Sequence, residues 1–318
     1  MKKITLIVFL LFAGYAAFSQ TVTDEVNNFN KKVGSPSDTL EGWTKGGVIT
    51  FSLTQGSLQN WAAGGDNFSL ALNGLANVFA NYRKGKNRWD NNLIMSYGLL
   101  KTTSLGMRKT DDNFDLTSKY GHQISDKWYA GALFDFRTQF ANGYLYPDDS
   151  TIVSHGFAPA YISLALGFNY QPTNYFSVFL SPVTSRFVLV TDQRLADQGA
   201  YGVDSAKYDA EGNLLSHGKN LEYQLGAYIS AQFNKDIFQN VNWTTRLDLF
   251  SNYLSNPQNI KVYWTSIFSM KINKFLTASL NTELIYDDDI RIWENKQGVK
   301  GPRTQFKEVF GLGFAYKF

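Results

Sequence analysis

Long segments of strict apolar–polar alternation restrict the fold of this chain more than any other feature. From Phe68 to Tyr82 every second residue is apolar or small, whereas the intervening positions include Ser69, Asn73 and Asn77. A period of two is that of a β-strand with one apolar and one polar face. The final stretch, EVFGLGFAYKF, repeats the pattern and ends the chain on an aromatic residue. We therefore expect an all-β protein.

The alternation predicts about twelve strands. They lie near residues 43–54, 67–83, 88–101, 112–124, 128–142, 158–171, 175–190, 221–234, 241–253, 259–272, 274–286 and 303–318. Most contain about 13 to 17 residues, whereas strands of globular proteins usually have about five or six. Tilted segments of this length can cross the hydrocarbon layer of a membrane, so a membrane protein is favoured over a β-sandwich.

The predicted connections differ in length according to their place in the chain. Those after the second, fourth, sixth, eighth and tenth strands are short, whereas those after odd strands are mostly longer, at 55–66, 102–111, 143–157, 191–220 and 287–302, with a shorter one near 254–258. Short periplasmic turns and long extracellular loops are typical of outer-membrane barrels. Backbone groups in lipid must all be paired, so we predict a transmembrane antiparallel β-barrel of about 12 strands whose first strand pairs with its last.

The composition agrees with a membrane barrel. Aromatic residues make up 16% of the chain and charged residues 18%, and the mean hydropathy is −0.25. Many aromatic residues beside many polar ones suit aromatic girdles around a wet interior. The absence of cysteine excludes disulfides, thiolate metal sites and a cysteine nucleophile. The net charge of +3 includes Lys2 and Lys3, and we expect no nucleic-acid partner.

The N-terminal segment predicts export. Two lysines precede an apolar run, and Ala17 and Ser19 are the small residues expected before a cleavage site. We assign residues 1–19 to a signal peptide, 20–42 to a polar periplasmic lead-in and 43–318 to the barrel. The predicted location is the outer membrane, with its lipids as partners.

Several stretches resemble a family of outer-membrane barrels of Bacteroidota that carry a domain of unknown function. The stretches are QGSLQNWAAGGDNFSL, WDNNLIMSYG, SKYG, FRTQFANGY, APAYISLALGFNY, LSPVTSRFVLV, LIYDDDI and GPRTQFKEVFGLGFAYKF. The resemblance covers roughly residues 42–318 and implies a barrel in the outer membrane. The family has no agreed activity, so it implies no catalytic residue and no cofactor. A last strand ending in Phe318 also resembles the signal that barrel-assembly machinery reads, which makes that machinery a predicted partner.

Charged and polar residues at inward positions of the predicted strands are the first candidates for function. They are Asp115, Lys119, Asp135, Arg137, Gln139, Arg186, Arg246, Asp248 and Glu283. Such residues could form a charged constriction that selects small polar solutes. They could equally close the lumen by pairing with one another, because a twelve-strand barrel is only moderately wider than one that side chains fill. Pro182 lies inside a predicted strand and indicates a bulge, which could turn Thr184 and Arg186 inward.

The predicted loops offer weaker candidates. Trp61 and Asp66 lie in the first long loop, where Trp61 could stack on a sugar or anchor the loop at the membrane interface. Acidic residues gather at Asp111 and Asp112, at Asp148 and Asp149, and at Asp287, Asp288 and Asp289. Carboxylates could hold Ca²⁺, but none has the spacing of a calcium loop, so solvated loop charge is favoured and no metal is expected.

Three functions remain open at this point. A channel for small polar solutes with a charged lumen is the first, and a structural or accessory subunit of an envelope assembly, bound to a protein partner, is the second. The third is a lipid-modifying enzyme. The chain has only three histidines. His122 shares a strand face with Ser118 but lies just before a short periplasmic turn, an awkward depth for attacking surface lipid. His155 and His217 lie in predicted outer loops without a recognisable nucleophile motif, so we name no catalytic residue.

A basic cluster lies at one predicted periplasmic turn. It consists of Arg83, Lys84, Lys86 and Arg88. Lipid phosphates are its simplest expected partner.

Overall fold

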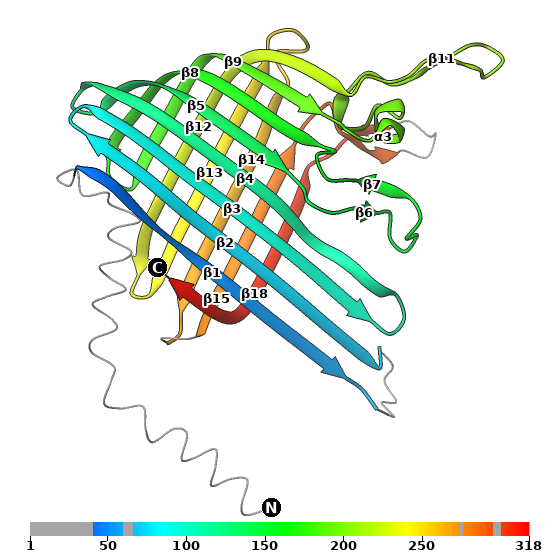
Figure 1. Cartoon of the computed structure of the whole chain (residues 1–318), viewed down its shortest axis with the longest axis horizontal. Coiled ribbons are helices and arrows are strands. Elements are labelled where there is room, and N and C mark those ends of the chain that lie inside the picture. The colour runs from blue at the N-terminus through cyan, green and yellow to red at the C-terminus, as the bar shows by residue number, and fades with distance from the viewer. Residues whose placement is uncertain (1–40, 60–65, 274–275, 295–299, 318) are drawn as a thin grey trace, which may run out of the picture.

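The protein is an antiparallel barrel of twelve strands. The computed structural model describes residues 41–59, 66–273, 276–294 and 300–317. The ring order is β1-β18-β15-β14-β13-β12-β9-β8-β5-β4-β3-β2 (Figure 1). These strands are β1 (Gly42–Ser57), β2 (Phe68–Lys84), β3 (Asn87–Thr102), β4 (Gly106–Ser125), β5 (Trp128–Thr138), β8 (Ala160–Thr173), β9 (Phe176–Leu189), β12 (Leu221–Phe238), β13 (Val241–Asn252), β14 (Ile260–Lys271), β15 (Leu276–Tyr286) and β18 (Gln305–Lys317). The predicted fold class and number of barrel strands are confirmed.

The alternation in the sequence places apolar side chains on the outside of the ring. In β8, Leu166 is 65% exposed, whereas its neighbour Ala165 is 1% exposed and faces the lumen. In β18, Phe310, Leu312 and Phe314 are all exposed. A surface of this kind would be unfavourable in water, since a contiguous apolar area of this extent normally marks contact with another apolar phase. None of the helices in the described part of the chain has the length and hydropathy needed to cross a membrane.

Aromatic side chains gather near both ends of the outer surface. At the short-turn end, Trp43 packs against Tyr82 and Trp89 with ring centroids 5.2 and 5.6 Å apart. In β5, Trp128 lies at the same end, and Phe136, eight residues further, packs 5.7 Å from Phe114. Eight residues span about 26 Å along a strand, or about 20 Å along the membrane normal at a tilt of about 40°. This separation is somewhat smaller than the apolar band of about 25 Å that aromatic girdles flank in outer-membrane barrels.

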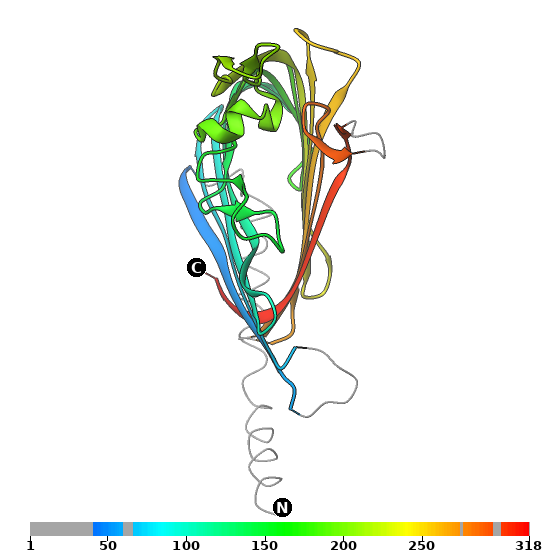
Figure 2. The ribbon, with the colours of Figure 1, turned by 90° about the vertical axis from the view of Figure 1, so that its right-hand side faces the viewer.

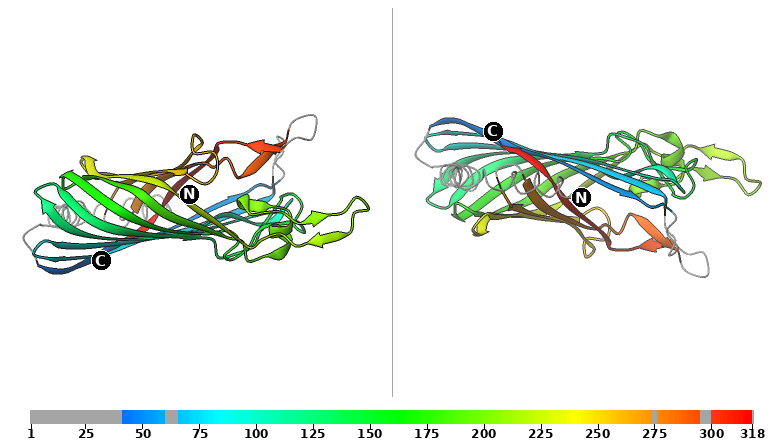
Figure 3. Two further views of the ribbon diagram at one scale, coloured as in Figure 1. Left: turned by 90° about the horizontal axis from the view of Figure 1, so that it is seen from above. Right: turned by 90° about the horizontal axis from the view of Figure 1, so that it is seen from below.

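Connections at the two ends differ as the sequence predicts. Turns at the short end include residues 85–86, 126–127 and 239–240. The opposite end carries β6 (Gly143–Tyr144), β7 (Ile152–Ser154), α3 (Gln193–Asp197), η1 (Ala200–Gly202), β10 (Lys207–Tyr208), β11 (Leu214–Ser216), β16 (Arg291–Glu294) and β17 (Lys300–Pro302). Figure 3 shows the β10–β11 and β16–β17 hairpins projecting from the same end of the barrel.

One predicted loop is a hairpin instead. The loop expected at 102–111 is reduced to residues 103–105, because β3 and β4 pair as far as Thr102 and Gly106. The pairing changes register between Gly98 and Leu99, where Thr110 is the extra residue of a bulge. The bulge interrupts the period-two pattern, which is why the sequence pattern suggested a loop. Asp111 and Asp112, predicted in that loop, therefore belong to β4.

The predicted bulge at Pro182 is present. Register shifts occur opposite it in both neighbours, between Leu166 and Phe168 and between Gly226 and Tyr228. Thr184, just after the bulge, is fully buried. The bulge thus reverses the alternation along β9, so that the side chain of Thr184 faces the lumen.

The ring closes through a short contact between its first and last strands. Residues 48–51 of β1 pair with residues 314–317 of β18, which makes four residue pairs. By contrast, β1 pairs with β2 along its whole length, from Gly42 to Ser57. Gly313 is required at the contact, because a Cβ there would lie 2.2 Å from the carbonyl oxygen of Phe51. The predicted pairing of the first and last strands is confirmed, but it covers a small part of each.

The barrel is flattened rather than round. Figure 2 shows two walls of strands facing each other, one containing β1 to β4 and the other β13 to β18. Side chains from opposite walls can therefore meet across the lumen.

A charged cavity and a cross-lumen network

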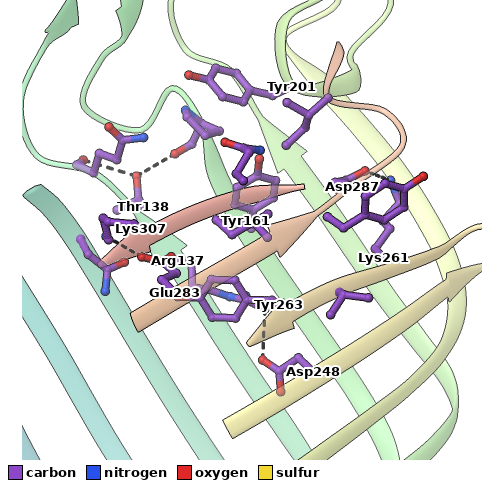
Figure 4. A pocket seen from close by; sticks show the side chains of 18 of the residues that line it. Arg137, Thr138, Tyr161, Tyr201, Asp248, Lys261, Tyr263, Glu283, Asp287 and Lys307 are labelled. Atoms are coloured by element: carbon purple, nitrogen blue, oxygen red, sulfur yellow. Dashed lines mark hydrogen bonds and ion pairs between the residues drawn. The ribbon is translucent and has the colours of Figure 1, made fainter. Parts of the chain in front are cut away.

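A cavity of about 850 Å³ lies inside the barrel toward the long loops. Figure 4 shows its labelled side chains, which come from strands on both walls and from the loops. Aromatic and charged residues contribute together, among them Arg137, Tyr161, Arg186, Tyr201, Tyr228, Asp248, Lys261, Tyr263, Glu283, Asp287 and Lys307. This volume lies within the range of small-molecule binding sites, about 300–1,000 Å³.

Arg246 is the centre of a buried network at the floor of this cavity. Its guanidinium donates to Asp135 at 2.7 Å, to Thr117 at 2.6 Å and to Asp248 at 2.8 Å. A longer contact of 3.3 Å reaches Asp115. The side chain of Arg246 is 10% exposed and that of Asp135 is 1% exposed.

The contacts of Arg246 cross the lumen. Arg246 lies on β13, whereas Asp115 and Asp135 lie on β4 and β5. In the ring, four strands separate β13 from β4 on one side and six on the other. A guanidinium that hydrogen-bonds to both walls occupies the space between them, so the network obstructs the lumen at this height.

Arg137 makes a second link across the same space. Its Nε lies 2.7 Å from Asp135 Oδ1 beside it, and its Nη2 lies 3.5 Å from Asp248 Oδ2 on β13. The guanidinium also stacks over Tyr263 of β14, 4.0 Å from the ring centroid. Such stacking on an aromatic face stabilises a cation and holds its plane in one orientation.

The network contains three carboxylates and two guanidinium groups. Isolated buried charges are unfavourable, but each member here has an opposite charge within hydrogen-bonding distance. Tyr228 completes it by donating to Asp248 at 2.9 Å. Removing Arg246 would leave Asp115 without a cation in contact among the described residues. It would also leave Asp135 and Asp248 with Arg137 alone, so Arg246 is the member on which most of the pairing depends.

Two further ion-paired groups surround the cavity above the network. Lys307 of β18 lies 2.5 Å from Glu283 and 3.0 Å from Asp111 of β4. On the other side, Arg186 of β9 donates to Gln224 at 2.9 Å and to Asp287 at 3.2 Å. In each group one contact reaches beyond the neighbouring strand, because β4 is not next to β18 in the ring and Asp287 lies in the loop after β15, which is not next to β9.

The acidic run at 287–289 is not the solvated loop charge that the sequence predicted. The carboxylate oxygens of Asp287, Asp288 and Asp289 lie within 4.8 Å of one another. The ammonium group of Lys261 contacts Asp287 and Asp289 directly and lies 3.8 Å from Asp288. Burial alone would raise the pKa of Asp287, but Arg186 and Lys261 hold it below its ordinary value. The ammonium group of Lys261 thus lies where a bound calcium ion was considered from the sequence.

The long loops roof the cavity. Ala158, Val190, Leu195, Ala196 and Val203 form a small apolar core within them. Tyr201, which lines the cavity, donates to the carbonyl oxygen of Val153 at 2.6 Å and so joins two loops. Burial raises the pKa of Tyr201 to about 12.

Other predicted residues lie apart from the network. Lys119 donates to Asn169 at 3.2 Å, and Gln139 accepts from Lys109 at 3.2 Å. Asp66 accepts two hydrogen bonds from Ser104, which tie the first loop to the β3–β4 hairpin. Trp61 lies outside the described residues.

The basic turn differs from its prediction at two of its four residues, whereas Lys84 and Lys86 are exposed. Arg83 is buried and lies 2.5 Å from Asp90, and Arg88 hydrogen-bonds to Gln171 and stacks 4.4 Å from the centroid of Tyr129. These two arginines contact protein groups, so they are not the exposed phosphate site that we expected. Alternation places both on the inward face.

The histidines occupy separate places. His122 contacts Asn87 on β3 at 2.8 Å, His155 contacts the carbonyl oxygen of Gly156, and His217 contacts Asp197 at 3.0 Å. Two lysines of the cavity, Lys261 and Lys307, were not among the predicted site residues. Both occupy inward positions of predicted strands, so the alternation that identified Glu283 could have identified them.

Comparison with known proteins gives little beyond the fold. Residues 53–144, less than a third of the chain, match the family described as "Protein of unknown function (DUF3078)". None of the curated proteins compared with the chain matches it.

Several solved structures are similar at low identity. An outer membrane channel from Pseudomonas putida F1 has 11% identity and a TM-score of 0.38, with 88% of this chain and 96% of that chain covered. The NanC porin has 8% identity and a TM-score of 0.35, with 84% and 98% covered. The translocator domain of the autotransporter NalP from Neisseria meningitidis has 11% identity and a TM-score of 0.32, with 93% and 95% covered. At these scores none indicates what this chain binds or transports.

Proposed function

We propose that this protein is an outer-membrane channel for small polar solutes and that the structure represents its closed state. The observation that carries the proposal is the network of Arg246, which joins opposite walls beneath a polar cavity. A solute could enter the cavity from the loop end, but its passage requires the network to separate.

The outer surface supports a membrane location. Exposed apolar side chains cover the strands, and two aromatic belts lie about 20 Å apart along the barrel axis. Short turns face one side and structured loops the other, as in bacterial outer-membrane barrels. The outer membrane is thus the proposed location.

The cavity suits an uncharged or zwitterionic solute. Its charged side chains are paired with one another, as for Lys307 with Glu283 and Arg186 with Asp287. A polar solute would offer hydroxyl groups or paired charges to these groups, and Tyr161 and Tyr263 offer aromatic faces. Neither sign of charge dominates the wall, so selection would act through hydrogen bonding and size.

Planar-bilayer conductance tests the proposal. The wild-type protein is expected to conduct weakly, and Arg246→Ala combined with Arg137→Ala should raise the open conductance or the open fraction about tenfold. Arg194→Ala is the matched control, because Arg194 pairs with Asp192 in a loop and its side chain is 69% exposed. Circular dichroism and the heat-dependent gel shift of folded barrels would show that each variant has folded.

Two outcomes would overturn the proposal. One is a folded double variant that conducts no better than the wild type. The other is a wild-type protein that is already fully open and insensitive to both substitutions. If the double variant does conduct better than the wild type, swelling of liposomes in small sugars and amino acids would identify the class of solute that passes.

A further inference from the structure

The contact between β1 and β18 is incomplete at the height of the cavity. Within the described residues, neither 52–57 of β1 nor 305–313 of β18 pairs with the other strand. Both segments are paired on their other edges, with β2 and β15. The wall between β1 and β18 is thus held by its four residue pairs. The two strands still adjoin at Ser52, where a Cβ on Gly311 would lie 3.5 Å from the Ser52 hydroxyl, and beyond that point their facing edges are unpaired within the described residues. This unpaired stretch is called the opening.

The start of β18 borders both the cavity and this opening. Gln305 and Lys307 face inward and line the cavity, as the alternation of β18 requires. Phe306 lies between them and also lines the cavity, although its side chain is 61% exposed on the outer face with Phe310 and Leu312. One residue therefore borders both the charged cavity and the apolar surface.

Backbone groups at this opening need polar partners. About half of the N–H and C=O groups of an antiparallel strand point toward each neighbour, so both free edges present several of them. Open edges that face dry hydrocarbon are strongly unfavourable. Water or polar groups from the side of the cavity must satisfy them, and the apolar side chains next to them remain in contact with lipid.

We propose that this opening is a lateral binding site for an amphiphile with one hydrocarbon chain and an uncharged, hydrogen-bonding head group. The head group lies against the free strand edges and the cavity, and the chain lies over Phe306 and Phe310. Lys307 is the nearest cation, but Glu283 and Asp111 already surround it at 2.5 and 3.0 Å. This excess of carboxylate disfavours an anionic head group.

The proposal rests on the proposed function only in placing the barrel in a membrane. Conductance through the lumen and access through the wall are measured separately, so each can fail alone. The absence of cysteine in the chain allows single labels at chosen positions.

Fluorescence quenching tests the opening. A bimane label at Gln305→Cys faces the cavity beside it, and one at Ser163→Cys faces the cavity on β8, which is paired on both edges. A third label at Leu312→Cys faces outward on β18. In vesicles of phosphatidylcholine with nitroxide-labelled acyl chains, we expect Gln305→Cys to be quenched at least half as strongly as Leu312→Cys, with Ser163→Cys at least fivefold less quenched. Equal quenching at Gln305→Cys and Ser163→Cys would overturn the opening.

Photo-crosslinking of the unmodified protein tests the ligand class. An alkyl glucoside with a diazirine on its chain should label residues 305–311 at least fivefold more than a fatty acid with the same chain and diazirine. Adding each probe either to the lipid before reconstitution or to the water around finished vesicles distinguishes entry from the bilayer from entry through the loops. Equal labelling by both probes, or labelling spread evenly around the barrel, would overturn the assignment.

Discussion

The middle of the lumen and the contact between β1 and β18 differ sharply in how they are held together. In the middle, side chains from opposite walls form a buried network in which Arg246 alone contacts four groups. At the contact, four residue pairs join strands that have 16 and 13 residues. The interior of the barrel is therefore closed by side chains, whereas its wall is joined weakly by backbone. Axial and lateral access are separate properties of the same barrel.

The largest expected effect comes from breaking the network. Arg246→Ala should lower the free energy of unfolding by about 3–5 kcal/mol, because Asp115, Asp135 and Asp248 would remain buried without their shared partner. Unfolding by urea in detergent micelles, followed by tryptophan fluorescence, measures the change.

The exposed pair of Arg194 with Asp192 is the reference for that change. Arg194→Ala should change the free energy of unfolding very little, because solvent screens this exposed pair. If the two variants lose equal stability, the network does not hold the walls together.

A disulfide across the contact should have the next largest effect. A Cβ on Gly311 would lie 3.9 Å from Cβ of Ser52, a separation typical of disulfides, about 3.5–4.5 Å. Ser52→Cys with Gly311→Cys should therefore oxidise readily and raise the free energy of unfolding by about 2–4 kcal/mol. Gel mobility with and without reductant, and unfolding under both conditions, measure the effect.

The pair Thr54→Cys with Val309→Cys is the matched control. It repeats the same spacing two residues further along each strand, and so lies further from the four residue pairs than Ser52 and Gly311 do. This pair should not form a disulfide. Oxidation at the rate of the first pair would show that the wall is closed there, against the proposed lateral site.

A smaller effect is expected in the roof of the cavity. Gly202 has φ +90°, and a Cβ there would lie 2.6 Å from Cβ of Asp289. Gly202→Val should destabilise the roof by about 1–3 kcal/mol through backbone strain and displacement of Asp289. Gly212→Val shares the positive φ but meets nothing within 4 Å. A protease should cleave between residues 191 and 220 faster in Gly202→Val than in Gly212→Val. Equal rates in the two variants would show that the contact between Gly202 and Asp289 does not stabilise the roof.

The smallest effect concerns pH in the same loop. Hydrogen bonds from Gln193 and His217 and the backbone N–H of Gly218 lower the pKa of Asp197. These bonds stabilise the loop above the unfolded pKa of about 3.9, and their contribution is lost as the pH falls through the lower folded pKa.

The amide signal of Gly218 in a nanodisc NMR spectrum should therefore shift as the pH is lowered below about 4. Asp192, Asp204 and Asp209 have lowered pKa values in the same loop. Asp197→Asn isolates the contribution of Asp197, and an unchanged titration in that variant would contradict the assignment.

The sequence predicted the strands well because each depends on a local pattern. Alternation alone indicates that Leu166 faces outward and Ala165 inward, and the lengths of the connections place the loops at one end. The bulge at Thr110 escaped prediction because one extra residue reverses the alternation and resembles the end of a strand.

The contacts of the site depend on the shape of the whole ring. Nothing near Arg246 in the sequence indicates that it meets Asp115, which is 131 residues away. That contact requires a flattened barrel with β13 opposite β4, and the sequence pattern carries no information about the cross-section. For the same reason, the pairing of β1 with β18 could be predicted, but its short extent could not.

The network also has a consequence for assembly. Asp135 has a cation on its own strand, Arg137, but Asp115 on β4 obtains its partner only from Arg246 on β13, 131 residues later. A sheet that ends before β13 therefore holds a carboxylate on its inner side without a cation of the network within hydrogen-bonding distance. We expect water to solvate that carboxylate until β13 joins the sheet, so the dry interior is a property of the assembled ring and of no single hairpin.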